Sequence, residues 1–143
     1  MLMTRVFYTD GSASPNPGPG GYAVVEGDKP VALGSESGDT TNIRMEGSAL
    51  IAAMQLADSE PCEIFTDSEF WINVITKWAP GWAAKGWRKS GGPIKNLELV
   101  QEAYQLYHTA GNVTLTWVRG HVGHEGNERA DEWANKAREG ARV

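Results

Sequence analysis

The sequence lacks the features of several protein classes. Its 143 residues include one cysteine, Cys62, so a disulfide framework is excluded and a reducing compartment, the cytoplasm, is expected. No apolar run approaches the roughly 20 residues of a membrane span. A strand-like run follows the first residues at once, so we expect neither a signal peptide nor a membrane partner. A hydrophobic content of 41% predicts a single soluble domain over residues 1–143.

Acidic residues are missing from one long segment. Between Glu69 and Glu98 the chain has five basic residues and no acidic one. The net charge of −5 is therefore the sum of +5 in this segment and −10 elsewhere. A basic segment in an otherwise acidic chain favours a nucleic-acid partner more than the net charge suggests. The five basic residues are Lys77, Lys85, Arg88, Lys89 and Lys95.

The pattern of apolar residues predicts an α/β fold with strands and helices that alternate after an initial antiparallel meander. We expect a mixed sheet with helices on its faces. The segment 78–93 is rich in glycine and tryptophan and is expected to be irregular. Strands are predicted at 4–10, 22–26, 30–37, 62–66 and 112–118, and helices at 44–57, 68–76, 94–109 and 127–139.

Two of the predicted strands end in a carboxylate followed by a small hydroxylated turn. These are Thr9-Asp10-Gly11-Ser12 and Thr66-Asp67-Ser68. If the two strands are adjacent and parallel, Asp10 and Asp67 lie side by side at one edge of the sheet. Two carboxylates that close repel each other unless one is protonated or a cation lies between them.

Two further carboxylates lie in predicted helices. Helical phase places Glu46 on the core-facing side with Leu50 and Ala53, where an unpaired carboxylate is rare. The alternative is a half-exposed residue favoured by the helix dipole. Asp131 lies beside the alanine stripe of the last helix, and on its own it is more simply explained as a solvated or boundary residue.

A cluster of carboxylates predicts a site for hard divalent cations. Oxygen ligands suit Mg²⁺ or Mn²⁺ and do not suit zinc. Such clusters are typical of phosphoryl transfer, in which two metal ions flank an in-line displacement.

The segment 119–126 contains two histidines, His121 and His124, in a glycine-rich loop. A loop histidine is most often simply solvated, but one that titrates near neutrality can also move protons or help to expel product. Zinc is disfavoured because the spacing is poor and no cysteine lies nearby.

Taken together, these motifs resemble bacterial type 1 ribonuclease H. Each is weak alone, but they occur in family order from residue 6 to residue 133. The matching residues are Asp10-Gly11-Ser12, Asn16-Pro17-Gly18-Pro19-Gly20-Gly21, Thr41-Asn42, Arg44-Met45-Glu46, Thr66-Asp67-Ser68, Gly86-Trp87, Lys95-Asn96, Trp117-Val118, Gly120-His121, Gly123-His124, Asn127-Glu128-Arg129 and Asp131-Glu132.

The resemblance implies a five-stranded mixed sheet, with the first three strands antiparallel and helices on both faces. It also implies an endoribonuclease that hydrolyses the RNA strand of RNA–DNA hybrids, leaving 5′-phosphate and 3′-hydroxyl ends. Two Mg²⁺ ions, replaceable by Mn²⁺, would be held by the four carboxylates. His121 matches a mobile catalytic histidine, and Glu128 matches an auxiliary acidic residue. The metal ligands would be Asp10, Glu46, Asp67 and Asp131.

The resemblance also suggests how the hybrid is held. Asn16, Thr41 and Asn42 match residues that contact the substrate, in part through the 2′-hydroxyl. The basic segment matches a protrusion in which Lys85, Arg88 and Lys89 would contact phosphates without reading sequence. The tryptophans of this segment, Trp78, Trp82 and Trp87, are more simply explained as a small core of the protrusion.

Two positions depart from the family pattern. Glu69 stands where glutamine is frequent, and Ile43 stands where asparagine is frequent, so we expect weaker binding of the hybrid and unchanged chemistry. Two alternatives are a non-catalytic hybrid-binding module and a nuclease or strand-transfer enzyme of the same fold that acts on DNA. The chain is expected to act as a monomer.

Overall fold

The computed structural model describes residues 4–120 and 124–143. Within these residues, five strands form one sheet in the order β3-β2-β1-β4-β5. β2 pairs antiparallel with both β1 and β3, whereas β4 is parallel to β1 and β5 is parallel to β4. The predicted mixed sheet with an antiparallel meander is confirmed. The strands are β1 (Arg5–Ala13), β2 (Gly18–Glu26), β3 (Lys29–Thr40), β4 (Cys62–Thr66) and β5 (Val113–Trp117).

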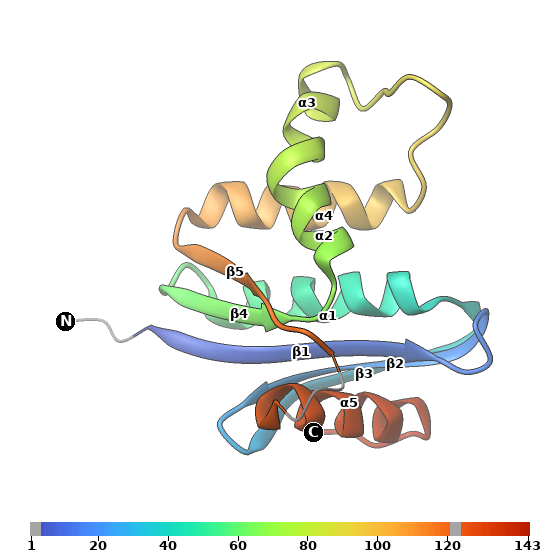
Figure 1. Ribbon diagram of the computed structural model, residues 1–143, viewed down its shortest axis with the longest axis vertical. Coiled ribbons are helices and arrows are strands. Elements are labelled where there is room, and N and C mark those ends of the chain that lie inside the picture. Colours follow the sequence, from blue (N-terminus) through green and yellow to red (C-terminus); the bar gives the residue numbers. More distant parts are fainter. Residues whose placement is uncertain (1–3, 121–123) are drawn as a thin grey trace.

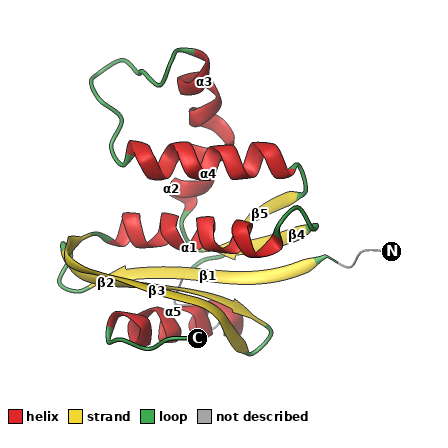
Figure 2. Ribbon diagram, turned by 180° about the vertical axis from the view of Figure 1, so that it is seen from behind, coloured by secondary structure: helices red, strands yellow, loops and turns green. Residues whose placement is uncertain are grey.

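Helices cover both faces of the sheet (Figure 1). α1 packs on one face and carries α4 above it, whereas α5 packs against β1 and β2 on the opposite face. The view from behind shows the same layers, with α3 and the loop after it at the end of the molecule farthest from the sheet (Figure 2). The helices are α1 (Asn42–Ala57), α2 (Glu69–Asn73), the π-helical turn η1 (Val74–Trp78), α3 (Ala79–Ala84), α4 (Leu97–Ala110) and α5 (Glu125–Arg138).

Predictions for two glycine-rich segments are wrong, for identifiable reasons. The strand predicted at 22–26 begins at Gly18, because glycines of the turn-rich segment pair with the end of β1, as Gly21 does with Ser12. A Cβ on Gly21 would lie 2.3 Å from the backbone of Arg138, so the absence of a side chain lets α5 approach. The segment 78–93 is not wholly irregular, since Ala79–Ala84 form α3 with a proline in its first turn.

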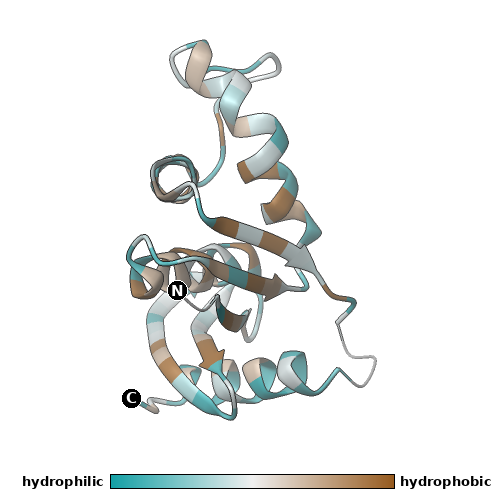
Figure 3. Ribbon diagram, turned by 90° about the vertical axis from the view of Figure 1, so that its left-hand side faces the viewer, coloured by the Kyte–Doolittle hydropathy of each residue, from teal (hydrophilic) through white to brown (hydrophobic). Residues whose placement is uncertain are grey.

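The main core lies between the sheet and the helices on the α1 side. Apolar and polar residues alternate along the strands (Figure 3), as expected for a sheet with distinct faces. Each fully buried large side chain contributes about 1.5–3 kcal/mol to stability. The largest apolar members are Trp71, Phe7, Leu50, Ile64, Ile75 and Val24.

No helix in the described part of the chain is long and apolar enough to cross a membrane.

Candidate active site

Three predicted carboxylates converge at the end of the parallel strand pair. One carboxylate oxygen from each of Asp10, Glu46 and Asp67 lies within 4.8 Å of the others. Asp10 is in β1 and Asp67 directly follows β4, each two residues beyond the paired residues Tyr8 and Phe65. The parallel register therefore places these carboxylates side by side.

One detail of the prediction for Asp10 is wrong. It does not end its strand, because β1 continues to Ala13 by pairing with the glycines of β2. Asp10 is consequently only 6% exposed and lies inside the sheet. Its carboxylate is desolvated to a degree that a strand-end residue would not be.

Gly11 allows Glu46 to approach β1. A Cβ on Gly11 would lie 2.2 Å from the carbonyl carbon of Met45 and 2.3 Å from the backbone nitrogen of Glu46. The first turns of α1 therefore lie directly on the backbone of β1. This contact brings a helix residue beside Asp10 of β1 and Asp67 at the end of β4.

The start of α1 is tied to the turn between β1 and β2. The hydroxyl of Thr41 caps the helix by accepting a bond from the Arg44 backbone N–H at 3.1 Å. The side-chain oxygen of Asn42 accepts from the Ala13 backbone N–H at 2.6 Å, and that of Asn16 accepts from the Asn42 backbone N–H at 3.2 Å. The structure thus brings together the three polar residues predicted to bind substrate.

Beside these residues is an open depression of about 580 Å³, lined by Asn16, Pro17, Thr41, Ile43, Lys95 and Asn96. Arg44 donates to the side-chain oxygens of Asn96 at 3.1 Å and Glu98 at 2.6 Å. These bonds join the starts of α1 and α4 and hold Asn96 at the rim of the depression.

Electrostatics in the carboxylate cluster favour protonation when no cation is present. Burial raises the pKa of Asp10 well above its usual range, and the charge of Asp67 raises it further. Burial also raises the pKa of Glu46 to about 7. The hydroxyl of Ser68 bonds to this carboxylate and partly offsets the increase. A positive charge among these carboxylates would therefore favour their ionised forms. A divalent ion would supply that charge, and it fits a site whose donor atoms are all oxygens.

Asp131 lies at the edge of the cluster. It is half-buried in the second turn of α5, and its side chain shares a hydrogen bond with Asp10 that raises the pKa of Asp10. It does not belong to the group of oxygens within 4.8 Å of one another. The structure thus places the fourth predicted ligand next to Asp10 but outside the tight group.

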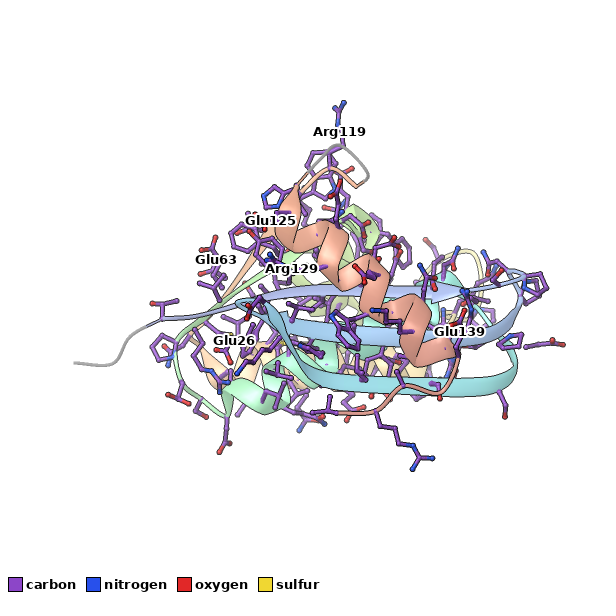
Figure 4. All side chains as sticks on the ribbon, turned by 90° about the horizontal axis from the view of Figure 1, so that it is seen from below. Glu26, Glu63, Arg119, Glu125, Arg129 and Glu139 are labelled. Carbon is purple, nitrogen blue, oxygen red and sulfur yellow. The ribbon has the colours of Figure 1, made fainter. Side chains whose placement is uncertain are left out.

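The histidine loop is described only in part. His121 lies outside the described residues. His124 precedes α5, and its ring lies 5.2 Å from the ring of Tyr8. Glu128 is exposed in the first turn of α5. Figure 4 shows α5 from below, with Glu125 and Arg129 along it and Arg119 projecting from the segment before it.

The predicted phosphate contacts Lys85, Arg88 and Lys89 are all exposed. They follow α3 at the end of the molecule farthest from the sheet, so they are not part of the carboxylate cluster (Figure 1). The two positions that depart from the family pattern are also on the surface: Glu69 is exposed at the start of α2, and Ile43 is 40% exposed.

The tryptophans of the basic segment have two different environments. Trp82 and Trp87 are partly buried and pack against the main core of the domain. Trp78 is instead 43% exposed, and with Phe70 it lines a groove of about 430 Å³ that also includes Lys89 and Lys95. An aromatic surface flanked by lysines suits the bases and phosphates of a nucleic acid.

Three residues that support the cluster had no role assigned from the sequence: Ser68, Trp71 and Trp117. Ser68 bonds to Glu46 and caps α2 by accepting from the Trp71 backbone N–H at 3.2 Å. Trp117 donates its indole N–H to the Asp67 carbonyl oxygen at 3.3 Å. The hydroxyl directly after Asp67 was a visible signal for Ser68, but the two tryptophans show no sequence pattern that separates them from core residues.

The chain is similar to known proteins over nearly its whole length. The RNase H family model matches residues 3–139. The ribonuclease H of Agrobacterium fabrum is 48% identical over 139 residues, which cover 92% of each chain. That of an Acidovorax species is 48% identical over 138 residues, again 92% of each chain.

A solved structure shows that the fold is also shared. LC9-RNase H1, described as a type 1 RNase H with the type 2 active-site motif, superposes with a TM-score of 0.75 at 30% identity. The superposition covers 98% of this chain and 75% of that one. The resemblance in the sequence motifs is thereby confirmed: the chain belongs to the ribonuclease H family, hydrolases that degrade the RNA of RNA–DNA hybrids.

Proposed function

We propose that this chain is an endoribonuclease that cuts the RNA strand of RNA–DNA hybrids with two divalent metal ions, Mg²⁺ or Mn²⁺ in its place. The observation that carries the proposal is the convergence of Asp10, Glu46 and Asp67 within 4.8 Å, with Asp131 bonded to Asp10. All four residues belong to one chain, so we propose that a monomer holds a complete site.

The carboxylates would bind the ions and orient the scissile phosphate. Ions held by these four residues would supply an attacking water of lowered pKa and positive charge for the departing 3′-oxygen, and the products would carry 5′-phosphate and 3′-hydroxyl ends. Ser68 holds the Glu46 carboxylate in place, and Gly11 keeps α1 close enough for it to take part. His121 and Glu128 would assist proton movement and product release.

The neighbouring depression would hold the RNA strand. Asn16 and Thr41 line it, and Asn42 bonds to Asn16 beside it. All three side chains accept bonds from backbone N–H groups, which supports a role in contacting the sugar edge and its 2′-hydroxyl. The exposed groove of Phe70 and Trp78, with the basic segment beyond it, would contact the DNA strand and its phosphates.

A cleavage assay tests the proposal. Labelled RNA–DNA hybrid, double-stranded RNA and double-stranded DNA are incubated with the protein and Mg²⁺, and the experiment is repeated with Asp10→Asn. We expect cleavage of the hybrid alone, with new 5′-phosphate ends, and loss of at least about 100-fold in the variant. Retained cleavage in Asp10→Asn would refute the metal assignment, and cleavage of DNA would indicate a different nuclease of this fold.

A further inference from the structure

Trp71 is a buried side chain that contacts α1 on both sides of the proposed ligand Glu46. Its indole N–H donates to the Ile43 carbonyl oxygen at 2.7 Å, in the first turn of the helix. Its six-membered ring lies against Gly47, where a Cβ would be 2.4 Å from Cζ2 and 2.7 Å from Cε2. The side chain is 0% exposed, so it has no room to move aside.

The backbone of Trp71 is also connected to the Glu46 carboxylate, through the hydroxyl of Ser68. Its N–H donates at 3.2 Å to the hydroxyl of Ser68, and that hydroxyl bonds to the Glu46 carboxylate. The Ser68 backbone N–H donates in turn to the Thr66 hydroxyl at 3.0 Å. Asp67 lies between these two residues, so the turn that carries it is fixed by the same set of bonds.

Packing on the other side of α1 leaves the helix little freedom. Gly11 of β1 lies against the backbone of Met45 and Glu46, and Trp71 presses on Gly47. The turn of α1 that contains Glu46 is therefore held between a strand backbone and an indole ring. Both contacts depend on a glycine, because a methyl group on either side would overlap its neighbour.

From these contacts we propose that Trp71 is a positioning residue for metal binding: it sets the distance between the Glu46 and Asp67 carboxylates through the Gly47 contact and the Ser68 hydroxyl. This inference rests on the proposed metal site. Groups that orient metal ligands commonly change metal affinity by about 10- to 100-fold when they are replaced. Trp71 touches neither substrate nor metal, so it should affect metal affinity without changing the hybrid contacts.

Direct titration of the substrate-free protein with Mn²⁺ tests the inference. We expect Trp71→Phe, which loses the indole N–H and part of the ring, to weaken Mn²⁺ binding by about 10-fold or more. In cleavage assays the Mg²⁺ concentration for half-maximal rate should rise by a similar factor. The KM for hybrid at saturating Mg²⁺ should stay within about twofold of the wild-type value, since Trp71 does not line the proposed RNA depression and meets it through the backbone carbonyl of Ile43.

Gly47→Ala supplies a second variant and, together with Trp71→Phe, a double-mutant cycle. Alone, the added methyl group should displace α1 from the indole ring and weaken Mn²⁺ binding. Combined with Trp71→Phe, it should have a smaller effect, because phenylalanine lacks the atoms it would meet. If Trp71→Phe does not fold, Gly47→Ala alone decides, and unchanged Mn²⁺ binding in that variant overturns the inference.

The controls separate the possible failures. Ile75→Ala removes a fully buried side chain one turn farther along the same segment and serves as a stability-matched control. Trp71 has no positioning role if Ile75→Ala weakens Mn²⁺ binding as much as Trp71→Phe does at an equal loss of melting temperature. The same conclusion follows if Trp71→Phe binds Mn²⁺ as tightly as the wild type. If the wild type and Asp10→Asn bind Mn²⁺ equally, the metal site itself is wrong.

Discussion

At the scale of single residues, the carboxylates of the site destabilise the folded protein when no metal is bound. Asp10 and Glu46 are removed from water and face Asp67, so their folded-state pKa values lie above those of an unfolded chain. The folded protein then binds more protons than the unfolded chain between roughly pH 4 and pH 9, with Glu46 contributing up to about pH 7 and Asp10 up to about pH 9. Its free energy of unfolding without metal therefore falls as the pH rises through this range. A bound divalent ion offsets the repulsion.

Neutralising Asp10 should stabilise the metal-free protein. Without metal at pH 8, Asp10→Asn should raise the melting temperature by roughly 3–6 °C, because the buried wild-type carboxyl, whose pKa is raised to about 9, must take up a proton on folding and the amide need not. The gain should shrink at pH 5, where taking up that proton costs less. Thermal melts at both pH values in a chelating buffer check this.

Asp28→Asn is the matched control, because Asp28 is exposed in the turn between β2 and β3. It should leave the melting temperature nearly unchanged at both pH values. A wild-type protein that is as stable as Asp10→Asn at pH 8 without metal would contradict the role of charge repulsion in the cluster. Added Mg²⁺ should stabilise the wild type more at pH 8 than at pH 6, and should stabilise Asp10→Asn less.

At the scale of elements, the start of α1 does more for the site than any other segment. It carries Glu46, it is capped by Thr41, and it contacts β1 at Gly11 without an intervening side chain. Three local features of the sequence produce this arrangement: the helical phase of Glu46, the cap at Thr41 and the glycine at position 11. The first two are visible in the sequence, whereas the reason for the glycine appears only once the helix is packed on the strand.

Replacing Gly11 with alanine tests the contact between these elements. The new Cβ would overlap the backbone of Met45 and Glu46, so α1 must shift away from β1. We expect a loss of about 1–3 kcal/mol in the free energy of unfolding. Cleavage should fall by about 100-fold, because a displacement near 1 Å at a catalytic group is that costly. Chemical denaturation and single-turnover cleavage measure the two effects.

Gly81→Ala provides the stability control. Gly81 lies in α3, and a Cβ there would meet nothing within 4 Å. Its free energy of unfolding should stay the same or rise, because alanine favours a helix more than glycine does. A Gly11→Ala variant with wild-type stability and cleavage would show that α1 does not need this close contact.

At the scale of the whole molecule, charge is divided between two ends. The acidic cluster lies at the sheet, and the basic segment after α3 lies at the far end from it (Figure 2). An extended polyanion can contact both if the metal ions neutralise the acidic end. The division therefore suits a nucleic-acid duplex better than a small phosphate ester.

This arrangement predicts the effect of removing the basic residues. Changing Lys85, Arg88 and Lys89 together to alanine should raise the KM for hybrid by about 10-fold or more at low salt and flatten its dependence on salt, because fewer counterions are released on binding. The kcat should change little. Initial rates over a range of salt concentrations measure both quantities.

The exposed residues Lys29 and Arg142, outside the basic segment, form the control pair. Their joint replacement by alanine lowers the net charge without touching the proposed binding surface, and should change KM by less than about twofold. An unchanged KM in the triple variant would show that the protrusion does not hold the hybrid.

The sequence by itself determined the elements and the chemistry. Periodicity, caps and turn residues act between near neighbours in the chain, which is why the strands, the long helices and the carboxylate at Glu46 were predictable. The strand predicted at 22–26 was placed correctly, but its start at Gly18 was missed because glycines carry no apolar pattern. Their lack of a side chain is what lets β2 pair beside α5.

Only the tertiary structure decided how the site is assembled. Asp10 and Asp67 meet because β4 pairs in parallel with β1, and Asp131 joins them because α5 covers the opposite face of the sheet from α1. The fit of Trp71 against Gly47 likewise exists only when α2 packs on α1. Contacts between distant parts of a chain depend on strand order and on the shapes of packed side chains, which local patterns do not encode.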